Sequence, residues 1–185
     1  MTDQELVQLI QQHGIEVIHF VTNMNTHGED FPTCLQTALR IHEQKTLSAC
    51  ALSKTGNITV EWSVGIIFDI TEVSQLHLVR STDGGSSGEY GLGEPPTTQS
   101  IVASLSNIDG RYNEWRVKGK KKIKGIFVRN VSDIRCWTTT EYFDPVAKRI
   151  IPTKDSLSFS LEEIRSYFPD QTLFTFNESK ELVPV

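Results

Sequence analysis

The sequence contains few cysteines and no paired cysteine motif. Its 185 residues include only Cys34, Cys50 and Cys136, with no CxxC spacing. An odd number of scattered thiols excludes a disulfide framework, and their spacing does not match a structural zinc site. Reduced thiols are the ordinary state of such cysteines in the cytoplasm, so we expect a cytoplasmic protein.

Long hydrophobic runs are also missing. No apolar stretch approaches the roughly 20 residues that a membrane-spanning helix needs. The first residues, MTDQE, do not begin a signal peptide, because no charged region precedes an apolar one. We therefore expect no membrane association. Apolar residues still make up 38% of the chain, enough for a core, and the length favours a single domain over residues 1–185.

Several common catalytic motifs are absent from the sequence. It has no nucleophile elbow, no HExxH and no histidines at metal-ligand spacing. The glycine-rich segment 83–93 lacks both GxxxxGK[ST] and a GxGxxG between a strand and a helix. We interpret this segment as a flexible lid, with a passive loop as the alternative.

Positive charge is scarce outside one stretch of the chain. The formal net charge is −5, from 18 basic and 23 acidic residues. Residues 111–129 contain eight basic residues and one acidic residue, which leaves the rest of the chain strongly acidic. A basic patch on an acidic protein indicates local attraction to a polyanion, and a solvated lysine-rich turn is the alternative.

The hydrophobic pattern predicts short strands and helices without a βαβ rhythm, which is typical of an α+β fold. Helices are expected at 3–12, from Asp30 and Pro32 to 42, at 99–108 and from Ser158 or Ser160 to 169, and a helical turn is expected at 69–78. Strands are expected at 15–21, 57–68, 113–118, 124–128, 134–137 and 173–176.

The single acid of the basic stretch is Glu114. Alternation in strand 113–118 puts Glu114 on one side and Trp115 on the other. A glutamate within a strand is disfavoured unless its face is open or used, so Glu114 is expected to face a cleft while Trp115 anchors the strand. Gly119 indicates a turn, so strands 113–118 and 124–128 are expected to form a lysine-rich hairpin. A salt-bridged surface strand is the alternative.

A histidine lies near the end of the first predicted strand. His19 is in phase with Ile15 and Val17 and is followed by the polar loop TNMNTHGED. Such a residue can hold a polar ligand. The alternative is a half-buried histidine whose hydrogen bonds are satisfied by the protein.

These two segments resemble ADP-ribosyltransferases. The stretch NEWRVKGKKKIKGIFV is similar to their catalytic-glutamate strand, and RYNE resembles the sequence around the glutamate of DarT-type DNA ADP-ribosyltransferases. VIHFVTNMN is similar to that family's early HxT…N nicotinamide-binding stretch, although Thr22 lies three residues after His19 instead of two. The resemblance covers these two segments and the order of the elements.

The resemblance implies an ADP-ribosyltransferase-like fold: two small, roughly perpendicular sheets with flanking helices and a central cleft. It implies NAD as a substrate, no metal, and Glu114 as the catalytic residue. The NAD-binding residues it implies are His19, Thr22, Asn25 and Arg40. Arg80 is a second candidate for the arginine that binds the diphosphate.

The chemistry of that reaction fits these residue types. Breaking the bond between nicotinamide and ribose builds positive charge on the sugar, which a carboxylate can stabilise. A histidine can hydrogen-bond NAD, and an arginine can bind its diphosphate. The basic residues would bring a phosphate backbone to the reacting carbon. These substrate-binding candidates are Arg116, Lys118, Lys120, Lys121 and Lys122. Trp115 and Trp137 could stack bases if exposed, but we expect both to be buried anchors.

We therefore predict NAD-dependent transfer of ADP-ribose to a nucleic acid, by an intracellular toxin or antiviral effector whose partner would be an antitoxin or immunity protein. ADP-ribosylation of a protein is one alternative. Another is a metal-dependent nuclease using Asp69 or Glu89 with Glu114 and Lys118. A third is a non-enzymatic nucleic-acid-binding module.

Overall fold

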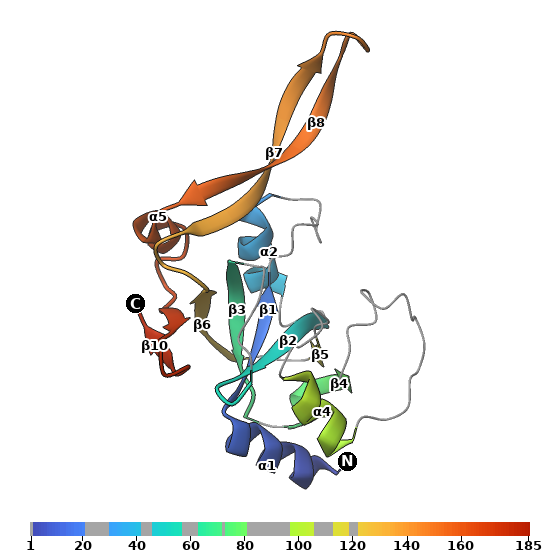
Figure 1. Ribbon diagram of the computed structural model, residues 1–185, viewed down its shortest axis with the longest axis vertical. Helices are drawn as coiled ribbons and strands as arrows, with labels where there is room; N and C mark the ends of the chain where they lie inside the picture. The colour runs from blue at the N-terminus through green and yellow to red at the C-terminus, as the bar shows by residue number, and fades with distance from the viewer. Residues whose placement is uncertain are drawn as a thin grey trace.

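The structure, a computed structural model, describes residues 2–20, 30–41, 46–56, 63–71, 73–80, 97–105, 113–118 and 122–185. Figure 1 shows the arrangement of its elements. The helices are α1 (Asp3–His13), α2 (Thr33–Ile41), α4 (Thr98–Ser104) and α5 (Leu161–Tyr167), with a 3₁₀ turn η1 (Val73–Gln75). The strands are β1 (Ile15–Phe20), β2 (Leu47–Ser53), β3 (Val64–Asp69), β4 (Leu76–Arg80), β5 (Glu114–Val117), β6 (Lys122–Val128), β7 (Ile134–Asp144), β8 (Arg149–Phe159), β9 (Leu173–Phe176) and β10 (Leu182–Pro184). The α+β class is confirmed.

Eight of the described strands form one mixed sheet in the order β10-β9-β6-β3-β1-β2-β5-β4. The pairing of β6 with β9 is parallel, and the other pairs are antiparallel. Among the described strands, β7 and β8 pair only with each other, as a separate two-stranded ribbon.

The sheet divides along β2. Residues 50–53 of β2 pair with β1, whereas residues 47–49 pair with β5. The last residues of β1, His19 and Phe20, pair with β3 but are not in register with β2. β1 and β2 therefore separate toward the end of β1, and the sheet opens at that point.

The expected lysine-rich hairpin is wrong. β5 pairs with β2 and β4, β6 pairs with β3 and β9, and three strands lie between β5 and β6. The chain from Val117 to Lys122 spans at most about 18 Å, whereas four strand spacings in a flat sheet would need about 19 Å. The sheet must therefore curve, which brings the end of β5 back toward the chain that follows β3. The backbone N–H of Lys118 donates to the carbonyl of Gln75 at 2.8 Å, which continues the pairing of β5 with β4 past the end of both strands.

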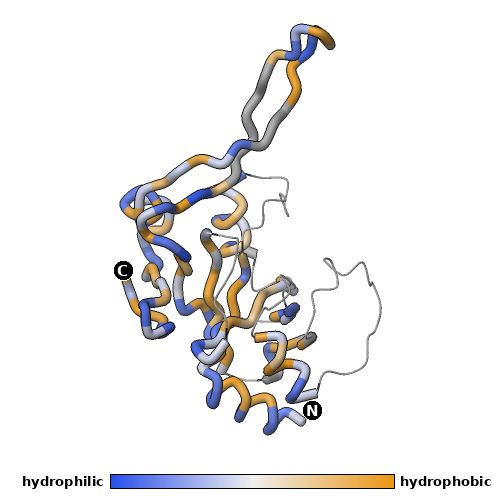
Figure 2. The backbone as a smooth tube through the Cα atoms, in the orientation of Figure 1, coloured by the Kyte–Doolittle hydropathy of each residue, from blue (hydrophilic) through white to orange (hydrophobic). Residues whose placement is uncertain are grey.

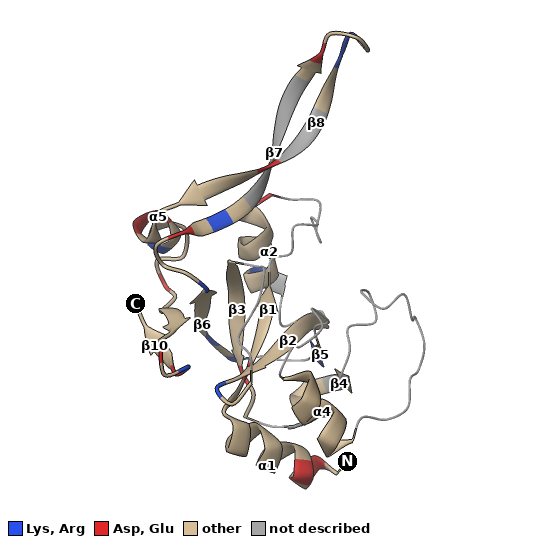
Figure 3. Cartoon of the chain, viewed as in Figure 1, with Lys and Arg blue, Asp and Glu red and all other residues tan. Residues whose placement is uncertain are grey.

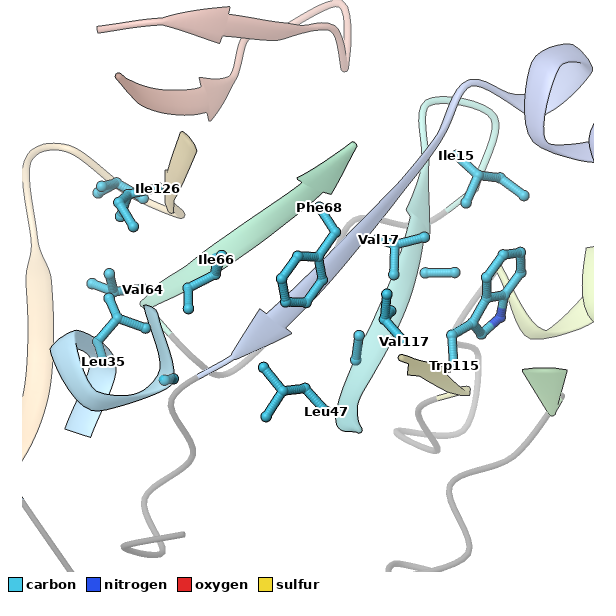
Figure 4. Close-up of a cluster of buried hydrophobic side chains, with 14 of the residues drawn as sticks. Ile15, Val17, Leu35, Leu47, Val64, Ile66, Phe68, Trp115, Val117 and Ile126 are labelled. Carbon is cyan, nitrogen blue, oxygen red and sulfur yellow. The ribbon is translucent and has the colours of Figure 1, made fainter. Parts of the chain in front are cut away.

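The two faces of the sheet carry separate apolar clusters, as strand alternation requires. The larger cluster contains Val17 of β1, Phe68 of β3, and Trp115 and Val117 of β5 (Figure 4). It is covered by side chains from the helices, including Leu35 of α2. The smaller cluster lies on the opposite face and contains Ile18, Phe20, Cys50, Leu52, Ile67 and Phe127, with Phe174, Phe176 and Leu182 packed against it.

Local capping signals define the helix ends. Thr2 and Glu5 form a capping box at the start of α1, and Gly14 ends that helix with a left-handed φ of 53°. Ser160 and Glu163 form the same box at the start of α5. Of the two expected start residues, Ser158 and Ser160, it is therefore Ser160 that caps this helix. None of the described helices is long and apolar enough to cross a membrane.

Several elements differ from the prediction. The helical turn expected within 69–78 is the 3₁₀ turn η1, and the chain then continues directly into β4, a strand that was not predicted. The strand expected at 57–68 is described only from residue 63, with β3 at Val64–Asp69. β2, β8 and β10 were not predicted, and the strand expected at 134–137 extends to Asp144. The glycine-rich segment 83–93 lies outside the described residues, so the lid interpretation stays a prediction.

Candidate functional site

Glu114 begins β5 and is buried, with 4% of its surface exposed. Its Oε1 accepts hydrogen bonds from Nε of Arg116 at 2.8 Å and from the hydroxyl of Ser48 at 3.2 Å. Its Oε2 is buried and has no hydrogen-bond partner among the described residues. Leaving a buried acceptor unpaired costs about 1–3 kcal/mol, more when it is charged, so an unpaired carboxylate oxygen is the feature expected where a ligand binds.

His19 lies near the point where β1 and β2 separate. It is 7% exposed, and its Nδ1 lies 2.6 Å from the carbonyl oxygen of Ser48. A carbonyl can only accept, so Nδ1 carries a proton. The His19 side chain thus bonds the carbonyl of Ser48 on β2, a residue that is outside the backbone register of β1 with β2. This bond fixes the orientation of the imidazole ring.

Ser48 connects the two predicted residues. Its backbone carbonyl accepts from His19, and its side-chain hydroxyl donates to Glu114. Sequence reasoning missed Ser48, because β2 itself was not predicted and the segment LSACALS carries no motif. Only the pairing of β2 with β1 and β5 shows that Ser48 lies between the histidine and the glutamate.

Asn113 sets the position at which β5 begins. Its Oδ1 accepts from the backbone N–H of Ala51 at 2.6 Å, and its Nδ2 donates to the Ala51 carbonyl at 2.9 Å. The side chain therefore extends the pairing of β2 with β5 by two positions beyond the backbone ladder, which ends at Ala49↔Trp115. Because Asn113 precedes Glu114 directly, these two bonds hold the carboxylate against β2.

The two candidate arginines lie in different places. Arg80 of β4 is the register partner of Glu114 on β5, so the backbone brings it to the catalytic candidate. Arg40 is exposed on α2, and its guanidinium donates to the hydroxyl of Thr37 at 2.8 Å. It lines a pocket of about 490 Å³ whose other lining residues all belong to α2 or to residues 167–171. The structure therefore does not bring Arg40 together with Glu114.

The predicted cations are only partly available to an anion. Arg116 is held by Glu114, and Lys122 lies 3.2 Å from Asp69. Lys124, from the same basic stretch, contacts Glu16 at 2.7 Å. Lys118 is exposed, with no ion pair among the described residues. Figure 3 shows the distribution of charged residues along the chain.

Some candidates lie outside the described residues. These are Thr22, Asn25, Glu89, Lys120 and Lys121. Within the described part, no group of three or more His, Cys, Asp and Glu side chains is placed to hold a metal ion. Asp69, which the nuclease alternative pairs with Glu114, is engaged by Lys122 at the end of β3.

Comparison with protein-family models, with curated proteins and with solved structures finds no match to this chain. Its function therefore has to be inferred from its own residues.

Proposed function

We propose that the protein transfers ADP-ribose from NAD to a nucleic acid, with Glu114 as the catalytic carboxylate. The observation that carries this proposal is the state of Glu114: a buried carboxylate with Oε1 held by Arg116 and Ser48, and Oε2 unpaired among the described residues. Loss of nicotinamide leaves positive charge on the ribose, and a fixed carboxylate stabilises that charge without reorganising.

Ser48 would act as a positioning residue for both halves of the site. Its hydroxyl orients the carboxylate of Glu114, and its carbonyl orients the ring of His19. NAD would then meet a carboxylate whose rotamer is already set, which lowers the entropic cost of assembling the reacting geometry. Arg80 is better supported than Arg40 as the diphosphate-binding arginine, since it is the register partner of Glu114.

The division of the sheet at β2 supports an ADP-ribosyltransferase-like fold. Such a fold needs a cleft between two half-sheets, and β1 separates from β2 on the side where β2 pairs with β5. His19 belongs to one half of the divided sheet and Glu114 to the other, with Ser48 of β2 bonded to both.

A polyanionic acceptor is supported by the cations on β5 and directly after it. Arg116 is 44% exposed along its side chain and lies two residues from Glu114, and Lys118 is exposed beyond it. The basic stretch continues through Lys120 and Lys121 in the sequence. Phosphate groups are the natural partners of such a run, and they would bring a nucleic acid next to the carboxylate.

The test compares Glu114→Gln with Glu16→Gln. Both substitutions remove the charge of an ion-paired glutamate in a strand of the same sheet, but only Glu114 belongs to the proposed site. Mass-labelled NAD is incubated with single-stranded DNA, RNA and a cell lysate, and the transferred label is measured by mass spectrometry. We expect Glu114→Gln to fold, to bind NAD and to lose transfer by at least about 10²-fold, the scale for removing one electrostatic stabiliser. Glu16→Gln should retain transfer.

Each of the other outcomes would change the functional class or the mechanism assigned to the protein. Wild-type transfer by Glu114→Gln would remove this residue from the mechanism. Label found only on protein would change the acceptor class to protein. No transfer by the wild type, together with Mg²⁺-dependent cleavage of nucleic acid, would make the protein a nuclease. Nucleic-acid binding with neither activity would leave a binding module.

A further inference from the structure

β7 and β8 form a long ribbon, called the arm here, that comprises residues 134–159. Its register runs without a shift from Ile134↔Phe159 at the base to Asp144↔Arg149 near the tip. The base is anchored in the core by Ile134 and Cys136, which are buried. Beyond the base the arm projects away from the body (Figure 1). A two-stranded ribbon without further strands or a covering layer is at best marginally stable in water.

The arm exposes more large apolar side chains than the rest of the described structure. Exposed large hydrophobic residues in the described part number six, and four of them lie on the arm: Phe143, Val146, Ile150 and Leu157. Phe143 and Ile150 are 60% and 61% exposed and lie directly opposite each other across the ribbon. Val146, between the end of β7 and the start of β8, is 92% exposed. Figure 2 shows both hydrophobic and hydrophilic residues at the tip of the arm. A cluster of this kind marks an interaction surface.

The two edges of the arm differ in their capacity to pair with another strand. Pro152 of β8 lies opposite Glu141. Proline has no N–H to donate. The hydrogen-bond ladder between β7 and β8 is therefore complete only if the backbone groups of Pro152 and Glu141 point away from the neighbouring strand. Arg135 lies an even number of residues before Glu141, so its backbone groups should point the same way. Its N–H does point outward, because it donates to the hydroxyl of Ser63 at 3.3 Å. Alternate residues of β7, Thr139 among them, therefore present their N–H and carbonyl groups on its outer edge, whereas Pro152 interrupts the outer edge of β8.

The charge pattern of β7 is complementary to itself in an antiparallel arrangement. Its base carries Arg135, its distal part carries Glu141 and Asp144, and residues 136–140 between them are uncharged. An antiparallel pairing of two copies around Thr139 puts Glu141 opposite Trp137 and ends before Arg135, whose N–H is already bonded to Ser63, and no like charges face each other. It also puts the cation at the base of one copy beside the acids near the tip of the other. A parallel pairing would place like charges opposite one another, which is destabilising.

We propose that the arm is a dimerisation element, in which two copies of the chain pair antiparallel through the outer edges of β7 around a two-fold axis at Thr139. The product is a four-stranded sheet, which meets the requirement for a stable sheet that one ribbon does not. It uses the same surface on both copies, as a closed two-fold interface requires. This inference does not depend on the proposed activity.

The first test is sedimentation velocity of the full chain across a concentration series, comparing Thr139→Pro with Lys154→Pro. The two positions lie directly opposite each other in the arm, so each substitution removes one outward N–H, from the β7 edge or from the β8 edge. We expect the wild type and Lys154→Pro to dimerise equally. Thr139→Pro should weaken the dimer about 30-fold, because the two hydrogen bonds exchanged at the axis are lost. A monomeric wild type, or equal behaviour of the two variants, would overturn the proposal.

A second test does not depend on how the arm tolerates proline. Thr139→Lys and Thr139→Glu each place two like charges opposite each other at the axis, so each variant alone should be monomeric. An equimolar mixture should recover the dimer, because lysine then faces glutamate. If either variant dimerises alone like the wild type, or if mixing restores nothing, the two-fold pairing at Thr139 is wrong.

Discussion

The side chain of Asn113 holds β5 against β2 through two hydrogen bonds, and removing them tests this role quantitatively. Asn113 is 3% exposed, and its partner Ala51 is 1% exposed. Asn113→Ala removes both bonds, at 2.6 and 2.9 Å, and leaves the N–H and the carbonyl of Ala51 without these partners. Each orphaned buried group costs about 1–3 kcal/mol, so a loss of about 3 kcal/mol is expected once partial hydration is allowed for. For a domain of this size, that corresponds to a Tm lower by about 6–12 °C.

Asn130→Ala is the matched control for this prediction. The carboxamide oxygen of Asn130 also accepts two hydrogen bonds, from the N–H and the hydroxyl of Ser132, but the residue is exposed. Water replaces both bonds there, so its cost should stay within about 0.5 kcal/mol. Urea denaturation with an unchanged m-value gives both free energies of unfolding. A cost below about 1 kcal/mol for Asn113→Ala, or one no larger than the control's, would refute the role assigned to Asn113.

Two further predictions concern other parts of the structure. Gly125→Ala should lower the free energy of unfolding, measured by urea denaturation, by about 1–3 kcal/mol or more. The added Cβ would lie 2.3 Å from the carbonyl oxygen of Thr172 and 2.7 Å from the ring of Phe174. An unchanged free energy of unfolding would contradict the close approach of β6 and β9. Burial, followed by the neighbouring Cys34, raises the pKa of the Cys136 thiol from 9.0 to about 12, so this thiol should resist disulfide reagents at pH 8 until the protein is unfolded. The thiol loses its proton at a higher pH in the folded state than in the unfolded state. The contribution of Cys136 to stability is therefore fully present below pH 9 and is lost as the pH rises toward 12. Cys136→Ser should abolish that part of the pH dependence of stability.

Elements with strong local signals were predictable from the sequence, and those that depend on long-range pairing were not. The ends of α1 and α5 follow from the stop at Gly14 and the cap at Ser160, which act within a few residues. β2 was missed because its small Ala and Ser residues have low strand propensity, and it is a strand only because β1 and β5 flank it. The error over strands 113–118 and 124–128 has the same origin, since a turn signal does not specify the partners of the strands beside it.

The candidate site shows the same limit. Alternation correctly put Trp115 in the core and Glu114 on the other face, because that pattern is local to one strand. Ser48 could not be found this way, since its bonds to His19 and Glu114 depend on the registers of two separate strand pairs. For the same reason, the sequence could not show that Arg80, unlike Arg40, is in register with Glu114. That distinction comes from the pairing of β4 with β5.

The ion pair of Glu114 with Arg116 bears on how a substrate would reach a buried carboxylate. The guanidinium of Arg116 lies 2.8 Å from Oε1, yet the Arg116 side chain is 44% exposed, whereas that of Glu114 is 5% exposed. Because Glu114 is buried, removing Arg116 leaves a buried charge with one bond fewer, which costs more than breaking an exposed ion pair. A phosphate group can draw Arg116 away only if its own bonds to the arginine offset that cost. Ser48 remains bonded to Oε1 when the arginine leaves, which keeps the carboxylate oriented. In the proposed reaction, the arrival of a phosphate-bearing substrate would therefore also open the catalytic group, so that binding and exposure of Glu114 occur together.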